Sequence, residues 1–552
     1  MKNNLFKIKN VFIGSAWPYG NSSLHLGHIA ALIGADILKK FFSQINIKTL
    51  WVSGTDCYGT PIAIEAQISK KSPKEIVNRF HQEFKKTFKN LGFSFDFYSR
   101  TTSKIHHQIV QKIFLDLLSK KLIYKKKQKQ FFCPKCKRFL PDRFIEGICP
   151  ICKKNARGDQ CDNCGALLEP KLLINPYCKI CKTKPILKET IHFFFKLSFF
   201  QKKLISWIKT QKNWRKNAKD FSLSFLKKGL KDRDITRDLE WGIKVPLKGF
   251  EGKVIYVWFE AVCGYLSASI EYSSKIGKNN YWKEFFLDKE SYHYYVFGKD
   301  NIPFHTIILP SILMSQDFHL PNQIVSSEYL LLEGKKLSKS KKWMIEVLKF
   351  LEFFESEFLR YYLIKINPQE SDSSFSFDDF YQKINKELIG NFGNYINRVL
   401  AFCFKNFGGE TFEFKKPFSK PQKEFFEKIE RNFFEVQGLI FKSHFKEALQ
   451  KIVNISIEGN RFLNQVQPWK KIKKTKKEAK EDLSLAIFSI DVLRKLIYPF
   501  LPKTSTKISK FIGKESILLE FKKEKIKISQ KPKPLFKPIE KNLLLKAKVS
   551  LF

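Results

Sequence analysis

The stretch VFIGSAWPYGNSSLHLGHIAALIGADILKKFF, residues 11–42, decides the fold of this chain. It opens with the short apolar run VFIGSA, which is typical of a buried strand. Turn-forming and helix-capping residues follow from Pro18 to Ser23, and apolar residues then recur at helical spacing from Leu26 to Phe42. A strand, a tight turn and an amphipathic helix in this order begin a βα unit, so the stretch predicts an α/β fold with a parallel sheet.

Two histidines lie at the start of the predicted helix. His25 and His28 are three residues apart, which places both on one side of the first helical turn. Gly27 carries no side chain, so part of a ligand could approach the backbone closely there. The free N–H groups of a helix N-terminus attract phosphate, and two imidazoles could stabilise charge that develops at a phosphorus atom. Two such histidines can also simply cap the helix, so the pattern alone does not establish a nucleotide site.

The regions around this stretch first continue the βα pattern and then interrupt it. Within residues 1–115, strand-like and helical runs alternate at Lys9–Ala16, Leu26–Phe42, Thr49–Val52 and Ser72–Leu91. Residues 116–240 hold many turn residues and most of the cysteines, which is typical of an insertion. Strand-like runs return within residues 241–330, at Lys253–Phe259, Ser291–Phe297 and Gln323–Tyr329. We therefore predict one Rossmann-type parallel sheet that is interrupted and then resumed.

The last part of the chain has the pattern of a helix bundle. Strand signals fade after about residue 345, and residues 386–515 are expected to form an antiparallel α-helical bundle. Its predicted helices carry apolar residues three and four apart, at Ile384–Phe404, Gln422–Phe441, His444–Leu463 and Glu478–Leu496. Residues 516–552 are Lys-rich and contain three prolines, so we expect a strap or a partly disordered tail.

Eight of the eleven cysteines form four C-x-x-C pairs inside the insertion: Cys133/Cys136, Cys149/Cys152, Cys161/Cys164 and Cys178/Cys181. Two such pairs supply four thiolates, the usual tetrahedral set of a structural Zn²⁺ ion, so eight cysteines predict two closed sites without a role in chemistry. A nested arrangement, with the two middle pairs around one ion, is favoured by their short spacing, and sequential pairing stays open. Free thiols also predict a reducing, cytoplasmic location. The other three cysteines, Cys57, Cys263 and Cys403, are most simply small buried residues.

Charge and hydropathy exclude some classes of protein. A hydrophobic content of 43% favours a globular chain, and no apolar run of membrane-spanning length or secretory signal is present. The net charge of +47 fits a polyanionic partner such as nucleic acid, and it fits equally well a compositional drift towards Lys, since the lysines are spread over the whole chain.

A second motif far downstream changes the meaning of the first. Gly334–Lys342 read GKKLSKSKK, in which Lys336-Leu337-Ser338-Lys339-Ser340 place several cations in a loop that can close over a polyphosphate. Together with His25-Leu26-Gly27-His28, this loop resembles the paired signature of the class I aminoacyl-tRNA synthetases. Leu stands at the second position of each motif where the family more often has another apolar residue.

The resemblance sharpens to the methionyl-tRNA synthetase family and extends to about residue 540. Four further stretches support it: Ala16–Tyr19, Gly54–Thr60, Trp258–Tyr265 and Gly298–His305. It implies that residues 331–385 hold the Lys-Leu-Ser-Lys-Ser loop and a stem-contact region, and that the helical bundle reads the anticodon of tRNA(Met), elongator and initiator.

Site residues follow from the resemblance, position by position. It implies an ATP site with Mg²⁺, formed by His25, Gly27, His28, Gly298, Asp300, Lys336, Ser338 and Lys339, of which His25, His28, Lys336 and Lys339 are catalytic. It implies an L-methionine pocket formed by Ala16, Trp17, Tyr19, Asp56, Trp258, Ala261, Tyr265 and His305, with Asp56 accepting the substrate ammonium group. The anticodon would be read by Asn394, Arg398 and Trp469.

Two alternatives stay open at this point. One is another class I synthetase for an apolar amino acid, since one methylene group changes binding by only about 1–3 kcal/mol. The other is a zinc-ribbon tRNA-binding protein without activity, against which the intact His25, His28, Lys336 and Lys339 argue. The insertion of about 125 residues leaves no room for a large editing domain. We also expect a monomer, because no appended C-terminal tRNA-binding or dimerisation domain is visible.

Overall fold

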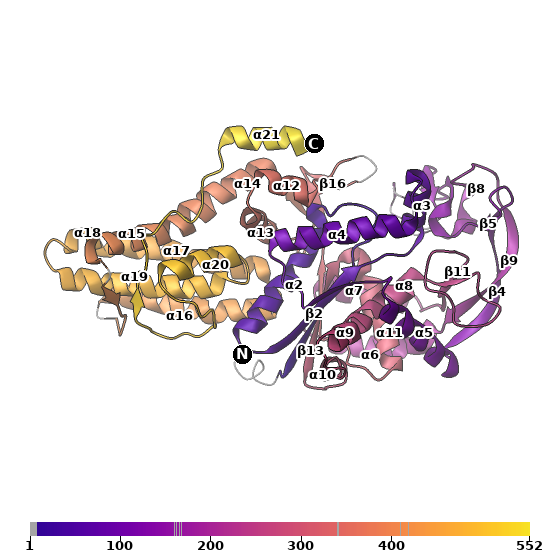
Figure 1. Cartoon of the computed structure of the whole chain (residues 1–552), viewed down its shortest axis with the longest axis horizontal. Helices are drawn as coiled ribbons and strands as arrows, with labels where there is room; N and C mark the ends of the chain where they lie inside the picture. Colours follow the sequence, from indigo (N-terminus) through magenta and orange to yellow (C-terminus); the bar gives the residue numbers. More distant parts are fainter. Residues whose placement is uncertain are drawn as a thin grey trace.

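The computed structural model describes residues 8–551, except for 159, 160, 162, 165, 167, 339–341, 409 and 418. The molecule is elongated (Figure 1), with the α/β part and its insertion at one end and a bundle of helices at the other. In the described part of the chain, no helix is both long enough and apolar enough to cross a bilayer.

The core of the α/β part is a parallel five-stranded sheet whose strand order is β14-β13-β1-β2-β3. The strands are β1 (Asn10–Ser15), β2 (Lys48–Thr55), β3 (Phe97–Arg100), β13 (Ser291–Gly298) and β14 (Gln323–Ser327). The chain adds β2 and β3 on one side of β1 and, after the insertion, β13 and β14 on the other side. This order confirms the predicted interrupted sheet, and it creates a topological switch point between β1 and β13, where α/β proteins bind their ligands.

Alternate residues of β1 face two separate cores. Val11 and Ile13 pack with helix α2 (Leu26–Gln44) in one core, whereas Phe12 packs in the other with helices α5 (Lys104–Ser119) and α9 (Gly264–Lys275). Helices therefore cover both faces of the sheet, as the buried strands require. Helix α4 (Pro73–Leu91) starts where the sequence predicted, because Ser72 and Glu75 form a reciprocal capping box.

The insertion is built on an antiparallel ribbon. Strand β4 (Ile123–Cys133) pairs along its length with β9 (Ile186–Phe195), and a small sheet of β6 (Ile145–Ile148), β7 (Asn155–Arg157) and β8 (Ile174–Cys178) lies between them in sequence. Helices α6 (Gln201–Thr210) and α7 (Lys216–Lys227) lead back towards the main sheet.

One strand prediction is wrong. Of the run Lys253–Phe259, only Val254–Ile255 form a strand, β12, and Val257–Glu260 form the short helix α8. Val257 and Phe259 are still buried. A short buried apolar run has no periodicity that separates a strand from a helix, which explains the error.

The C-terminal half forms the predicted bundle. Its helices are α15 (Asn394–Phe407), α16 (Lys420–Phe441), α17 (Phe445–Val466), α18 (Pro468–Lys471), α19 (Lys476–Ile497) and α20 (Pro502–Phe511). The predicted helix over Ile384–Phe404 is divided, since Lys383–Gly393 form a π-helix, η7, that runs directly into α15.

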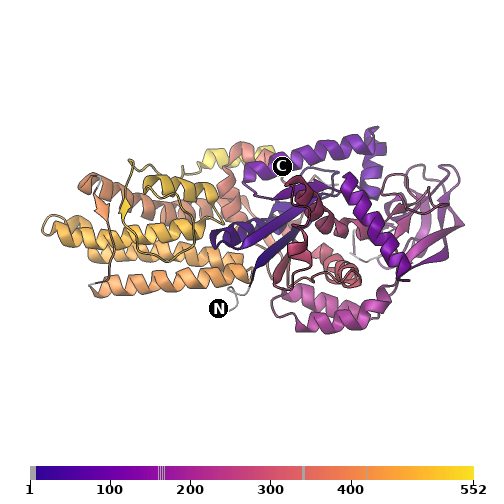
Figure 2. The same cartoon turned by 60° about the horizontal axis from the view of Figure 1, so that its bottom comes forward.

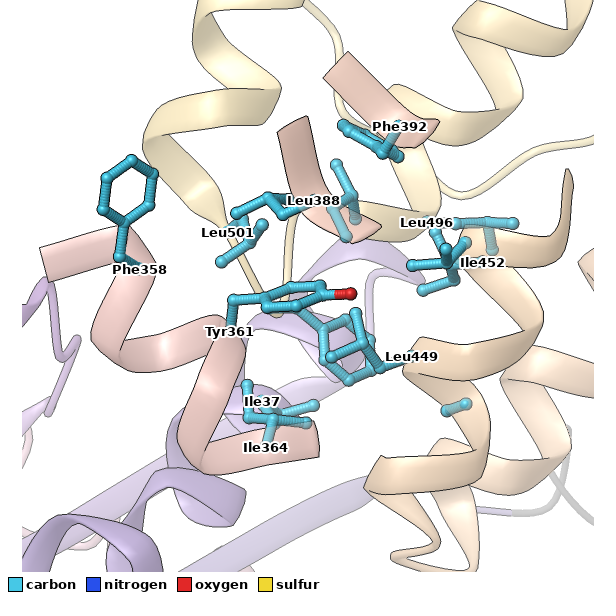
Figure 3. Close-up of a cluster of buried hydrophobic side chains, with 14 of the residues drawn as sticks. Ile37, Phe358, Tyr361, Ile364, Leu388, Phe392, Leu449, Ile452, Leu496 and Leu501 are labelled. Carbon is cyan, nitrogen blue, oxygen red and sulfur yellow. The ribbon is translucent and has the colours of Figure 1, made fainter. Parts of the chain in front are cut away.

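The bundle and the α/β part share one hydrophobic core. Figure 3 shows Tyr361 of α13 (Ser356–Lys365) in one cluster with Ile37 of α2, Leu449 of α17 and other buried side chains. Polar groups reinforce this contact, because the buried Arg360 guanidinium lies 2.7 Å from the Asp36 carboxylate and also donates to the Phe500 carbonyl. The bundle is thus fixed to α2, the helix that His25 caps and that carries His28 in its first turn.

The Lys-rich tail is a strap with a helix at its end. Leu535, Phe536 and Ile539 are buried, and the Asn385 side chain forms two hydrogen bonds with the backbone of Ile539. Helix α21 (Lys541–Leu551) then lies near α12 (Val347–Phe353) and α14 (Phe377–Gln382), as the view in Figure 2 also shows.

Candidate active site, metal clusters and RNA-reading surface

The two predicted histidines form a reciprocal cap at the start of α2. His25 Nδ1 accepts from the Gly27 N–H at 3.2 Å, and His28 Nδ1 accepts from the His25 N–H at 3.1 Å. Burial lowers the pKa of His28 to about 4 and holds the pKa of His25 well below its usual range. Both rings are therefore neutral at pH 7, and since each Nδ1 is an acceptor, the proton of each ring lies on Nε2. The cap leaves two N–H donors that can serve a ligand.

The second motif lies directly against the first. A Cβ atom on Gly27 would be 2.8 Å from Cδ1 of Leu337, so the space that the glycine leaves is filled by the loop. The backbone pairs as well, because Leu26 donates to Ile345 and Val347 donates to Leu24. The structure thus brings together motifs that are far apart in sequence.

The residues on either side of the loop tip pair through their backbones. Ser338 and Trp343 exchange two backbone hydrogen bonds of 2.9 Å, and the Trp343 indole donates to the Leu332 carbonyl. Lys336 is exposed, with its Nζ 5.5 Å from the centre of the Tyr329 ring. Lys339 falls outside the described residues.

The predicted adenosine residues lie at the end of β13. Gly298 ends this strand beside Ala16, whose N–H donates to the Val296 carbonyl, so both residues lie at the switch point. Asp300 accepts a hydrogen bond from the Tyr329 hydroxyl. Tyr329, which the sequence did not indicate, thereby lies between Asp300 and Lys336.

A buried aromatic cluster lies beside the switch point. The Tyr265 hydroxyl donates to His305 Nε2 at 2.7 Å, because His305 Nδ1 donates to the Asn301 carbonyl and burial lowers the His305 pKa to about 4. Trp17 packs edge-on against Tyr265, and a Cβ atom on Gly54 or Gly264 would lie within 2.9 Å of the Trp17 ring. The two glycines form a slot for this indole.

The other predicted pocket residues surround this cluster. Ala261 begins the short helix η4 (Ala261–Cys263), directly before α9. Tyr19 and Asp56 are partners in an isolated parallel β-bridge, so their backbones lie side by side. Trp258 is the exposed member, with 38% of its surface accessible and its ring packed against Phe304.

Two carboxyl groups are buried near these rings. Asp56 accepts the Tyr58 N–H at 3.2 Å, and burial, with Glu260 as a second cause, raises the pKa of Asp56 well above its usual range. Glu260 is fully buried and lies 2.7 Å from His106 Nε2. No role is predicted for Glu260 from the sequence, although it lies within the stretch Trp258–Tyr265, and His106 carries no recognisable signal.

The eight cysteines form two clusters in the nested arrangement. Cys133, Cys136, Cys178 and Cys181 make one, and Cys149, Cys152, Cys161 and Cys164 make the other. Within each cluster, sulfur atoms from one C-x-x-C pair lie 3.4 to 4.0 Å from sulfur atoms of the other pair. Four sulfurs about 2.3 Å from a central Zn²⁺ would be about 3.8 Å apart, so both clusters fit a tetrahedral ion. As expected, Cys57, Cys263 and Cys403 are buried outside these clusters.

The three predicted anticodon residues lie on one part of the bundle. Asn394 is exposed at the start of α15, one turn before Arg398. The Arg398 guanidinium lies 4.4 Å from the centre of the Trp469 ring, and its Nη1 donates to Asn464 of α17. Arg398 and Trp469 are both partly exposed, and a guanidinium on an indole is a platform on which an unpaired base can stack.

Comparison with known proteins places these features in a family context. The family model described as tRNA synthetases class I (M) matches residues 11–400, and the anticodon binding domain of methionyl tRNA ligase matches residues 416–529. A methionine–tRNA ligase of Streptococcus pneumoniae (strain CGSP14) is 43% identical over 505 residues, covering 90% of this chain and 91% of the relative. One from Bacillus cereus (strain B4264) is 42% identical over 503 residues, with the same coverage.

Solved structures agree in fold. The methionyl-tRNA synthetase of Mycobacterium tuberculosis bound by methionyl-adenylate superposes with a TM-score of 0.78 at 21% identity, over 96% of this chain and 100% of the other. A second structure of that protein with methionyl-adenylate gives a TM-score of 0.79 at 22% identity, over the same shares of the two chains. At these identities the likeness concerns the arrangement of the elements.

Proposed function

The chain belongs to the methionine–tRNA ligase family of class I aminoacyl-tRNA synthetases, and we propose from this that it activates L-methionine with ATP and transfers the methionyl group to the 3′ end of tRNA(Met), elongator and initiator. The observation that carries the proposal is the contact between Gly27 and Leu337. It joins two phosphate-binding motifs at the switch point of the sheet, beside a buried aromatic cluster with its own carboxylate.

In the first step, the methionine carboxylate attacks the α-phosphorus of ATP·Mg²⁺ and pyrophosphate leaves. The Nε2–H groups of His25 and His28, with Lys336 and Lys339, stabilise the charge on the phosphates without a covalent protein intermediate. Gly27 and Ser338 lie in the same two motifs, and Gly298 and Asp300 hold the adenosine. In the second step, the terminal ribose 2′-OH of the tRNA attacks the adenylate carbonyl and AMP leaves.

The aromatic cluster suits a methionine side chain. A flexible thioether gains favourable contacts with rings, and the cluster offers Trp17, Tyr19, Trp258, Tyr265 and His305 around the small residues Ala16 and Ala261. The neutral His305, hydrogen-bonded to Tyr265, presents no charge to the sulfur. Asp56 accepts a hydrogen bond from the substrate ammonium group, and this group provides the cation that the buried carboxylate lacks.

The thiolate clusters hold one Zn²⁺ ion each and act structurally. Four sulfur ligands close the coordination sphere, so these ions have no open position for a substrate. The eight thiols also need a reducing, cytoplasmic setting. We also propose that the domains of the chain end at residues 115, 240, 330, 385 and 515.

The bundle reads the anticodon. Asn394 and Arg398 hydrogen-bond base edges, and Trp469 stacks an unpaired base. We further propose that the chain acts as a monomer, which a mass near 65.0 kDa in light scattering at micromolar concentration would support and a mass of about twice that value would refute.

Pyrophosphate exchange with each of the twenty amino acids tests the function. Methionine should give the highest exchange rate, and a transcript of tRNA(Met) with its CAU anticodon should be charged far better than one with a changed anticodon. A best response to leucine, valine, isoleucine or cysteine would favour a different class I specificity. Tight tRNA binding without any exchange would favour an inactive RNA-binding protein.

A further inference from the structure

A buried hydrogen-bond chain lies beside the proposed amino-acid site, since the His106 ring centre is 6.2 Å from that of Trp17 and Glu260 interacts electrostatically with Asp56. It runs from Glu260 of α8 to His106 of α5 and on to Ser267 of α9, with distances of 2.7 Å from Glu260 Oε2 to His106 Nε2 and from His106 Nδ1 to Ser267 Oγ. Glu260 and His106 are inaccessible to solvent and Ser267 nearly so. The other carboxyl oxygen of Glu260, Oε1, is buried and has no hydrogen-bond partner.

The direction of the hydrogen bonds locates one proton. The Ser267 hydroxyl donates to the Gly264 carbonyl at 3.2 Å, so its oxygen accepts from His106 Nδ1–H. Burial lowers the pKa of His106 to about 3, so this ring is neutral and its Nε2 can only accept. Glu260 must then supply the proton of the Glu260–His106 hydrogen bond, which is consistent with burial raising the Glu260 pKa well above its usual range.

Asp56 differs from Glu260 in its hydrogen bonds. The Tyr58 N–H donates to Asp56 Oδ1, and a donor of this kind stabilises the ionised form. Two carboxyl groups that share a buried site cannot both ionise without a cation between them. Because His106 accepts the proton of Glu260, the site can hold one negative charge once the substrate ammonium group is bound, and that charge lies on Asp56.

We propose that Glu260 and His106 are positioning residues of the amino-acid site, which keep its second carboxyl group neutral so that Asp56 alone faces the substrate ammonium group. This inference rests on the proposed function, because it assigns the partner of Asp56 as the methionine ammonium. Without the acceptor His106, Glu260 and Asp56 would share one proton, and the anion that the ammonium group requires would be formed only in part.

Other ionisable groups face the same region and enter any pH dependence. Glu271 accepts hydrogen bonds from Ser99 and Ser103 and interacts with His106. The remaining groups that interact electrostatically with Asp56, Glu260 or their neighbours are Tyr19, Cys57, Tyr58, Arg100, Arg143, His107 and Cys263.

The test is a set of three variants measured by methionine-dependent pyrophosphate exchange. Glu260→Gln keeps the shape and the donor to His106 Nε2 and is always neutral, so KM for methionine should stay within about threefold of the parent value. His106→Phe keeps a planar ring without an acceptor for the Glu260 proton, so it should raise that KM by about 10-fold to 100-fold, the equivalent of a charge-assisted hydrogen bond, with a smaller change in kcat. Its kcat/KM should also fall more steeply as the pH is lowered from 8 to 6.

The double variant His106→Phe with Glu260→Gln should recover a KM near the parent value, because it has no second carboxyl group. The matched control is His192→Phe, since His192 is a buried histidine that lies 3.0 Å from Asp238 in the insertion, away from this site. It should leave KM for methionine unchanged.

Two results would overturn the inference. One is a loss in Glu260→Gln as large as that in Asp56→Asn, which would make Glu260 an anion that binds the ammonium group itself. The other is a His106→Phe defect that Glu260→Gln does not relieve, which would make His106 a packing residue only. Failure of the proposed function would be seen separately, as a parent enzyme without methionine-dependent exchange.

Discussion

Leu337 packs onto Gly27, at a distance that leaves no room for a methyl group on the glycine. The apolar residue in the middle of the cationic loop therefore holds that loop against the helix that carries His25 and His28. The backbone hydrogen bonds from Leu26 to Ile345 and from Val347 to Leu24 fix the same contact on the far side of the loop. Leu337 and the segment Ile345–Val347 thus lie against the helix start, where a triphosphate would meet both motifs.

Gly27→Ala should separate the two motifs. The added methyl group would lie 2.8 Å from Leu337, and overpacking of this kind costs about 1–3 kcal/mol, so the exchange rate should fall roughly 5-fold to 150-fold. Truncation of the partner in Gly27→Ala with Leu337→Ala should restore part of the rate. Gly252→Ala is the matched control, because no atom lies within 4 Å of a Cβ at that position. The added methyl group would also lie 3.0 Å from the His25 ring, so a double variant as slow as Gly27→Ala would assign the clash to His25 and not to Leu337.

His25 has two tasks that different substitutions can separate. His25→Asn keeps an acceptor for the Gly27 N–H, as an asparagine N-cap does, but loses the Nε2–H donor. It should reduce pyrophosphate exchange by about 10²-fold to 10³-fold and leave the free energy of unfolding nearly unchanged. His25→Ala should lose the same activity and also about 1 kcal/mol of stability in urea unfolding. Equal stability of the two variants would show that the cap does not stabilise the helix.

The neutral His305 should make the protein sensitive to acid. Its pKa is lowered from 6.5 to about 4 in the folded chain, so the unfolded chain binds this proton first as the pH falls. The stabilisation is complete above pH 7 and is lost between pH 6.5 and 4, by roughly 3 kcal/mol. Urea unfolding of the parent and of His305→Gln over this pH range should show a shallower decline in the variant. Parallel curves would contradict the lowered pKa.

Metal content distinguishes nested from sequential cysteine pairing. In the nested arrangement, Cys133→Ser with Cys178→Ser damages one cluster and Cys133→Ser with Cys149→Ser damages both. The first pair should therefore retain about one zinc per chain and the second close to none, whereas sequential pairing predicts the reverse. The parent should contain two, and Cys57→Ser should keep both. Adenylate formation should survive in any variant that stays folded.

Trp469 should matter for tRNA and not for adenylate formation. Removal of a stacking ring costs about 1–3 kcal/mol, so Trp469→Ala should lower kcat/KM for tRNA(Met) by roughly 5-fold to 150-fold. Trp469→Phe keeps an aromatic face for the base and for Arg398 and should retain most of the activity. Methionine-dependent exchange without tRNA should be the same in all three proteins. A defect in that exchange would assign Trp469 to the packing of the bundle.

Much of the architecture could be read from local patterns. The run VFIGSA, the turn from Pro18 to Ser23 and the periodic stretch from Leu26 predicted β1 and α2 within a few residues, because each pattern sets its own hydrogen bonding. The same holds for the helices of the bundle. The run Lys253–Phe259 failed because burial in a shared core, and not periodicity, decides whether such a run becomes a strand or a helix.

By itself the sequence predicted the main strands of the sheet and the helices of the bundle, indicated the family through its motifs, and pointed to candidate residues for phosphate, thioether and thiolate binding. These features follow from residue types and short spacings, which act within a few turns of the chain. Only the tertiary structure decided that Leu337 meets Gly27, that the cysteine pairs are nested, and that His106 accepts the proton of Glu260 beside Asp56. Each of these contacts joins distant segments, so it depends on how whole elements pack, and no local pattern encodes that packing.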